Sequence, residues 1–234
     1  MSDQDWRKWE RAWEADPGDQ VALQRAISAR RRTGQPIPGW LLEQTVHPPR
    51  TFNSVHPLNV FVRLPCGEER RIGVTPHAGR DLEIPEHTVW WVEPEARLPF
   101  GVTEFDLALC QELNRRGVPG LVAKRSRITD GVLESLGSCE QLERLELGGC
   151  SLVTEEGLEH LVDLPLNRLT LKDCDQIEDP GMRALSELPN LNRLEMSGAA
   201  RVTDAGLAHL ARVTHLTELR LVGSGITDVG FGHV

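Results

Sequence analysis

Three groups of residues in this chain have types and spacings that chemistry could use. Cys150 and Cys174 occupy the same position in two neighbouring copies of a repeat, and such a pair could be redox-active or bind a metal. An acidic cluster, whose oxygens suit a hard cation such as calcium, consists of Asp173, Asp175, Glu178 and Asp179. A histidine set shares one recurring position, at His160, His209 and His233.

Each group also has a structural explanation, which we favour. Ala199 and Ser224 fill the cysteine position in later copies, which is typical of a small buried residue. The acidic cluster lacks the EF-hand order, because Glu178 stands where that loop needs glycine. His160 and His209 are two copies apart, roughly 10 Å at the strand spacing, so they are expected to be surface histidines of two helices.

No motif of a known catalytic or cofactor-binding site is present. The chain lacks G-x-S-x-G, G-x-G-x-x-G, the phosphate-loop lysine motif and H-E-x-x-H. We therefore expect a protein without enzymatic activity and without a cofactor. The alternative is an enzyme whose site lies in residues 49–101, around His56, Cys66, His77, Asp81 and His87, although their spacing matches no reaction.

Composition indicates a soluble, acidic protein of one or two domains. The chain has 234 residues, a hydrophobic content of 39% and a formal charge of -9, with 13 bases and 21 acids in residues 102–234. This acidic excess disfavours nucleic acid as a partner. No apolar run is long enough to span a membrane, and no signal peptide is recognisable at the start. Five cysteines without zinc or redox spacing favour free thiols and a cytoplasmic location.

A repeat of 24 or 25 residues organises the second half of the chain. Its first mark is a three-residue motif that begins at Ile128 and returns at Val153, Ile177, Val202 and Ile226. Its second mark is an L-x-L motif that begins at Leu145 and returns at Leu169, Leu194 and Leu219. A period kept at two positions over four copies predicts a repeat protein.

Each copy has a strand half and a helix half. The L-x-L motif alternates with period two, whereas pairs such as Leu158 and Leu161 have helical spacing. The aspartates that close the three-residue motif are expected to cap the helices, and the glycines that follow are expected to make room between stacked helices. Stacking then buries the leucines between a parallel sheet and an outer helix layer, which is an α/β solenoid.

The segment from Val202 to Leu210, followed by Leu216, Leu219 and Leu221, resembles a leucine-rich repeat. The variety is the cysteine-containing one, known from F-box leucine-rich-repeat proteins and bacterial relatives, with Cys150 and Cys174 at its cysteine position. The resemblance covers residues 102–234 and implies a solenoid whose concave sheet binds a protein partner.

The chain is predicted to have three parts. Residues 1–48 form a helical segment, with Trp6, Trp9 and Trp13 on one helix face, and they resemble the helical repeat-companion segment of bacterial repeat arrays. Residues 49–101 form a small β-rich unit. The solenoid spans residues 102–234, with an irregular first repeat over 102–127, regular repeats from about 128 and an incomplete last repeat.

The side chains between the inward-facing leucines are expected to point outward on the concave face. These are Arg144, Glu146, Arg168, Thr170, Arg193, Glu195, Glu218 and Arg220, followed by Lys172 and Asp173. A mixed-charge surface of this kind could select a protein partner, or its charges could simply pair with one another. Two further alternatives are an adaptor for a protein-modifying or degrading enzyme, and self-association through the last repeat.

Overall fold

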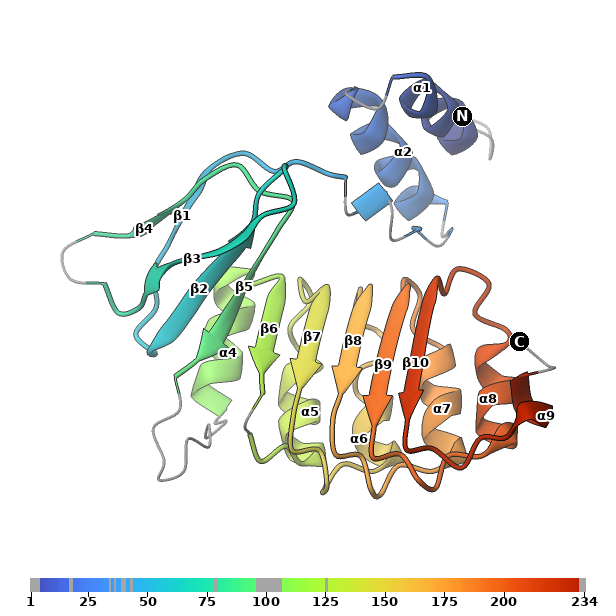
Figure 1. Ribbon diagram of the computed structural model, residues 1–234. Helices are drawn as coiled ribbons and strands as arrows, with labels where there is room; N and C mark the ends of the chain where they lie inside the picture. The colour runs from blue at the N-terminus through green and yellow to red at the C-terminus, as the bar shows by residue number, and fades with distance from the viewer. Residues whose placement is uncertain are drawn as a thin grey trace.

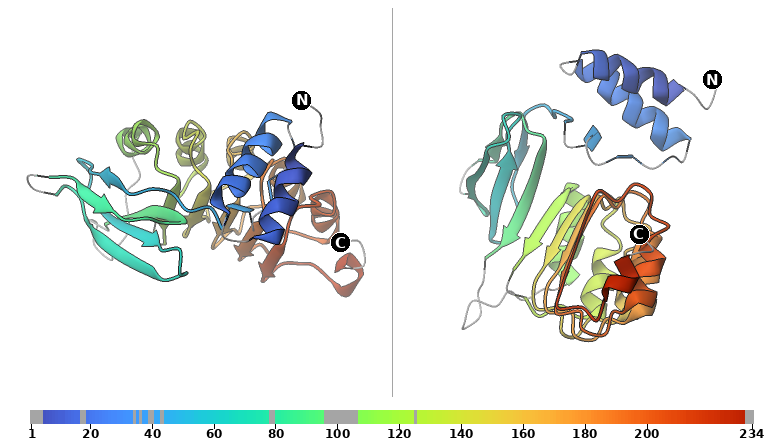
Figure 2. Two further views of the ribbon diagram at one scale, coloured as in Figure 1. Left: turned by 90° about the horizontal axis from the view of Figure 1, so that it is seen from above. Right: turned by 45° about the vertical axis from the view of Figure 1, so that its right-hand side comes forward.

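A computed structural model describes residues 5–16, 19–33, 35, 37–38, 41–42, 44–77, 80–95, 107–124 and 126–231. Its main body is an eight-stranded sheet with a row of helices behind one face, and a helical hairpin lies beyond the ends at which the parallel strands begin (Figure 1). The right-hand view in Figure 2 shows the hairpin above the ends at which the parallel strands begin, and the left-hand view shows it lying over the solenoid. The parallel strands and helix layer confirm the predicted α/β solenoid.

Helices and strands alternate along the solenoid. The helices are α4 (Leu107–Arg116), α5 (Asp130–Leu136), α6 (Glu155–Glu159), α7 (Asp179–Ser186), α8 (Asp204–Leu210) and α9 (Asp228–Phe231). The strands are β6 (Gly120–Ala123), β7 (Arg144–Leu147), β8 (Arg168–Leu171), β9 (Arg193–Ser197) and β10 (Glu218–Val222). The part of the first repeat predicted around Val102 and Thr103 lies outside the described residues.

The leucines of the L-x-L motif stack in register and form the core. Leu145 pairs with Leu169, which pairs with Leu194, and none of the three is more than 1% exposed. Burying one such side chain contributes about 1.5–3 kcal/mol, so the ladder is a major source of stability. One apolar core runs from the β unit through the repeats.

The β unit continues the sheet of the solenoid. Its strands are β1 (Arg50–Phe52), β2 (Leu58–Arg63), β3 (Glu69–Val74), β4 (Leu82–Ile84) and β5 (Val89–Pro94). Strand β5 lies parallel to β6, with Val92 beside Leu121, and β2 and β3 follow in antiparallel order. The first strand of the solenoid is therefore paired on both sides, and its backbone presents no open edge.

The N-terminal hairpin has a small core of its own. Helix α1 (Asp5–Ala15) packs on α2 (Gln20–Arg32), and Trp9 and Trp13 contact a cluster that includes Leu23, Ile27 and Leu41. Trp9 and Trp13 of the tryptophan stripe thus serve this core, whereas Trp6 contacts the Arg30 guanidinium. Among the helices of the described residues, none is both long enough and apolar enough to cross a membrane.

Two asparagine contacts attach the segment after the hairpin to the repeats. The Asn192 side chain, 1% exposed, donates a hydrogen bond to the Ile37 carbonyl at 3.2 Å. The Ile37 amide donates to Asn190 Oδ1 at 3.4 Å. Asn190 and Asn192 precede β9. The segment around Ile37 therefore contacts the repeats at the end of the sheet where the parallel strands begin.

The recurring aspartates do not cap their own helices, which corrects the sequence-based expectation. The N-caps of α6 and α8 are Thr154 and Thr203, whose hydroxyls accept hydrogen bonds from amides two residues on. Asp130 instead accepts from the amide and the hydroxyl of Thr154, both at 2.9 Å. Asp179 bonds Thr203 in the same way, and Asp204 bonds Thr227. Each aspartate therefore ties its repeat to the next one.

The glycines after the threonines make room for these carboxylates. A Cβ on Gly157 would lie 2.2 Å from Asp130 Oδ1, and one on Gly206 would lie 2.4 Å from Asp179 Oδ1. Gly181 differs, because among the junctions from α5 to α9 it follows the one that lacks this aspartate–threonine bond, and its Cβ would meet Ile177 and Leu158 instead. Because Asp130 and Asp179 are the first residues of α5 and α7, these glycines also lie against neighbouring helices, which confirms the expected close approach of stacked helices.

At the other end of the sheet β10 has no further strand beside it within residues 126–231. Val222 and Val229 are 54% and 71% exposed there. Self-association through this end stays a prediction.

We expect Gly157→Ala to lower the free energy of unfolding by about 1–3 kcal/mol, because the new methyl group would displace the Asp130 carboxylate. Gly131→Ala is the matched control, since its Cβ meets nothing nearer than 3.9 Å and its helix would gain about 0.5 kcal/mol. Urea unfolding of both variants measures the two changes. Equal effects of the same sign would contradict the role given to Gly157.

Candidate functional site

The predicted outward residues share the sheet face that the helices leave free. Strand register places Arg144, Arg168, Arg193 and Glu218 in one row across four strands. A second row consists of Glu146, Thr170, Glu195 and Arg220. Lys172 and Asp173 directly follow β8. We call this face, from β2 to β10, the concave face.

Two of these residues are less accessible than the sequence predicts. Arg144 is 8% exposed and Thr170 is 7% exposed. Thr170 is short and lies between the longer side chains of Glu146 and Glu195 in its row. Arg144 is covered by an aromatic ring from the β unit.

The concave face carries aromatic residues that repeat analysis alone did not place there. Phe61 on β2 pairs with Trp91 on β5, and their rings stack at 5.6 Å with an angle of 7°. The Arg144 guanidinium lies 4.1 Å from the Trp91 ring centroid, a cation–π contact. Gly120 permits this contact, because a Cβ there would lie 2.5 Å from Trp91 Cβ.

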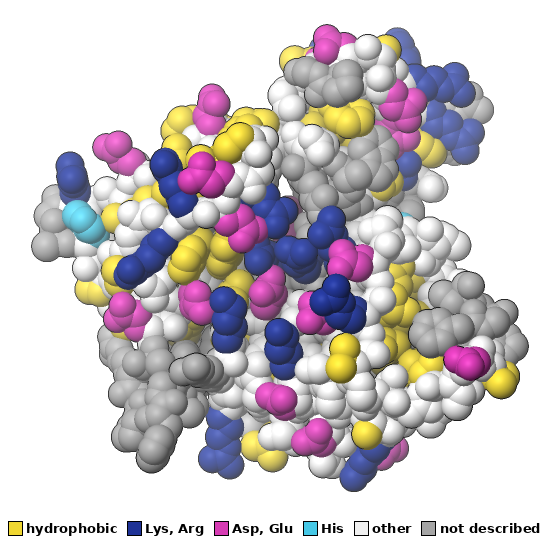
Figure 3. Space-filling model, viewed as in Figure 1, with side chains coloured by type: hydrophobic (Ala, Val, Ile, Leu, Met, Phe, Trp, Pro, Cys, Tyr) yellow, Lys and Arg dark blue, Asp and Glu magenta, His cyan; other side chains and the backbone are white. Residues whose placement is uncertain are grey.

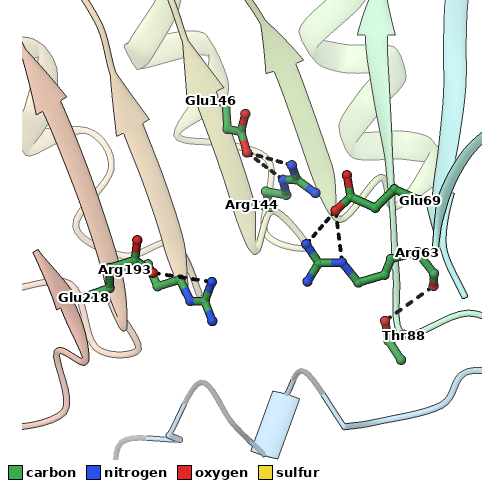
Figure 4. A network of polar contacts seen from close by, with 7 residues as sticks. All are labelled: Arg63, Glu69, Thr88, Arg144, Glu146, Arg193 and Glu218. Atoms are coloured by element: carbon green, nitrogen blue, oxygen red, sulfur yellow. Dashed lines mark hydrogen bonds and ion pairs between the residues drawn. The ribbon is translucent and has the colours of Figure 1, made fainter. Parts of the chain in front are cut away.

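Most charges on this face are paired, as one of the two sequence-based alternatives expects. Arg144 bonds Glu146 at 2.7 Å, and Arg193 lies 3.5 Å from Glu218. Arg63, from β2, bonds Glu69 on the adjacent strand β3 at 2.5 Å. Figure 4 shows the guanidinium groups of Arg144 and Arg63 extending toward each other, and that of Arg193 pointing toward the same region.

Arg168 is the exception in this row. Its side chain forms no hydrogen bond or ion pair with any of the residues that the structure describes. Burial, together with repulsion from Arg144 and Arg193, lowers the pKa of Arg168, and Glu146 offsets this only in part. Because a guanidinium stays protonated, the lowered pKa reflects an unfavourable positive charge in the folded protein.

The cysteine pair has the properties of core residues. Cys150 and Cys174 are both fully buried and free, whereas Cys66 is exposed. The hydrogen bond with Cys150, followed by burial, raises the pKa of Cys174. The thiolate that redox chemistry requires is therefore disfavoured at this position.

The acidic residues of the predicted cation cluster have separate structural contacts. Asp179 binds Thr203, and Glu178 forms an ion pair with Arg201 at 2.9 Å. Asp173 has φ +62°, at the loop position that Gly198 fills in the next repeat with φ +75°. Within the described residues, no group of three or more metal-ligating side chains could hold an ion.

The histidines and the candidate residues of the β unit are dispersed. His160 is exposed and His209 half-buried, while His233 lies outside the described residues. His56 precedes β2 and Cys66 follows it, so a six-residue strand of roughly 20 Å separates them. His77 and Asp81 flank the turn between β3 and β4, and His87, which is buried, precedes β5.

A comparison with protein families agrees with the repeat assignment. Residues 164–186 and 214–231 match the family model described as Leucine Rich repeat. The solved structure of an internalin from Listeria monocytogenes is similar, with 20% sequence identity and a TM-score of 0.40. The match covers 55% of this chain and 35% of the internalin chain, so this chain spans about a third of that protein.

We expect Arg168→Gln to raise the free energy of unfolding by about 0.5–1 kcal/mol, because it removes a poorly solvated charge beside other arginines. Arg193→Gln is the control, since it loses the Glu218 pair and should lower stability by about 0–1 kcal/mol. Thermal unfolding at low salt measures both. A destabilised Arg168→Gln protein would contradict the electrostatic account.

Proposed function

We propose that this chain is a non-catalytic module that binds a protein partner through its concave face. Leucine-rich repeats generally mediate protein–protein interaction, and two segments of this chain match that family. The observation that carries the proposal is one continuous sheet face on which arginines, carboxylates and stacked aromatic rings lie in register.

The composition of this face supports a protein partner. Tryptophan and arginine often dominate the binding energy of protein interfaces. Arg168 and Arg193 are partly exposed on this face, and the buried pair of Trp91 and Arg144 adjoins them at the β-unit end of the row. At β10 the charge reverses in both rows. Glu218 ends the row of three arginines, and Arg220 ends the row that contains Glu146 and Glu195. A partner whose charges are complementary along the row would bind preferentially, and the reversal at β10 would also fix the orientation in which it binds.

The helix layer offers a natural contrast for testing this proposal. Arg183 on α7 and Arg212 after α8 are exposed basic residues on the other side of the sheet. Reversing their charge changes the net charge as much as reversing Arg168 and Arg193 does. A difference between the two double variants therefore reports the face that binds.

We expect the double variant Arg168→Glu, Arg193→Glu to lose at least about tenfold of partner capture, because carboxylates would replace the central cations of the face. The variant Arg183→Glu, Arg212→Glu should capture the partner as the wild type does. Quantitative affinity purification from the native host with mass spectrometry measures capture, and circular dichroism verifies folding. Equal capture by both folded variants would refute binding at the concave face.

A further inference from the structure

A small pocket lies on the concave face where β7 and β8 begin. Its volume is about 40 Å³, and its polar lining consists of Arg63, Thr88, Glu143, Arg144, Asn167 and Arg168. Three arginines and one glutamate thus line it; Arg144 pairs with Glu146 and Arg63 with Glu69, both outside the lining, whereas Arg168 has no such partner among the described residues. In Figure 3 the Lys and Arg side chains gather at this part of the face, between the β unit and the N-terminal helices. The space suits one small polar group of a ligand.

Arg144 is held rigidly with one donor unused. Its side chain is 10% exposed, its Nε and Nη2 donate to Glu146 at 2.9 and 2.7 Å, and its ring contact with Trp91 fixes the guanidinium plane. Nη1 is buried and has no hydrogen-bond partner. A buried donor without a partner costs stability, so a ligand atom that accepts its proton would be bound favourably.

Arg168 and Arg63 supply the remaining positive charge. Arg168 lies beside Arg144 in the register of β7 and β8, and it has no ionic partner within the described part of the chain. Thr88 donates its hydroxyl proton to the Arg63 carbonyl, which links the start of β5 to the end of β2 beside the pocket. Repulsion among these arginines falls when an anion enters.

We propose that Arg63, Arg144 and Arg168 form a binding site for an oxyanion, supplied by a carboxylate or phosphate group on a side chain of the protein partner. This inference rests on the proposed function and adds the chemical group that the concave face recognises. The planar forks of arginine match both kinds of oxyanion, and a group bound in the pocket would lie beside Arg168 and Arg144 together.

The site can be tested on the full chain without knowledge of the partner. Inorganic phosphate and glutarate are titrated separately at constant ionic strength, with chloride as the replaced anion. The assigned Nε–H resonances of Arg144 and Arg168 are followed by NMR. We expect both to shift saturably with at least one of the two anions, and the preferred anion then identifies phosphate or carboxylate as the recognised group.

Two variants localise the binding. Arg168→Gln should weaken binding of the preferred anion at least about tenfold, measured on the Arg144 resonance, because it removes the unpaired charge. Arg220→Gln removes an exposed arginine of the same face outside the pocket and should change affinity less than about twofold. Linear shifts with both anions, or equal affinity of Arg168→Gln and wild type, would overturn the site.

These results are separable from those on partner capture. If capture depends on Arg168 and Arg193 but neither anion binds saturably, the concave face binds a protein and the oxyanion site is wrong. If an anion binds as expected but capture survives charge reversal, the oxyanion site stands and its ligand is a small molecule instead of a protein side chain.

Discussion

The inward-facing leucines of the parallel strands are the constraint on which the other features depend. Because side chains alternate along a strand, burying one leucine from each repeat forces its neighbours onto the opposite face, whatever their charge. Residues of the same position then stack at about 4.8 Å, and arginine is placed beside arginine. Glu146 and Glu218 compensate two members of that row. The remaining member, Arg168, has no such partner among the described residues, and burial together with repulsion from Arg144 and Arg193 lowers its pKa.

The repeating part of the fold could be predicted from the sequence because its signal is periodic. The L-x-L motif identified β7 to β10, and the residues between the leucines were correctly placed on one face. Register follows from the same pattern, since a slip of one residue would expose every buried leucine. The small residues Cys150 and Cys174 likewise occupy core positions, as the alanine and serine at equivalent positions suggested.

The rest depends on contacts between segments that share no period. Nothing local indicates that β5 pairs with β6, and only that pairing brings Trp91 over Gly120 to Arg144. The role of the aspartates was mistaken for a similar reason. A carboxylate beside a helix start is commonly a cap, whereas Asp130 reaches the threonine of the following repeat, 24 residues away. Long-range geometry therefore decides both the shape of the candidate site and the bonds between repeats.

One junction between the described repeats lacks the aspartate–threonine bond. At the junction between α6 and α7, Glu155 stands in place of the aspartate and Glu178 in place of the threonine. This junction therefore lacks the aspartate–threonine hydrogen bond that the junctions on either side possess. In a linear array, stability is set by each contact between adjacent units, and the weakest contact is where opening begins. Amides of the loop before α7 should therefore exchange sooner than those of the corresponding loops before α6 and α8, where the bond is present. Arg168 lies on β8, the strand between α6 and α7, and therefore beside this junction. A ligand that bridges β7 and β8 would also hold the two repeats together there.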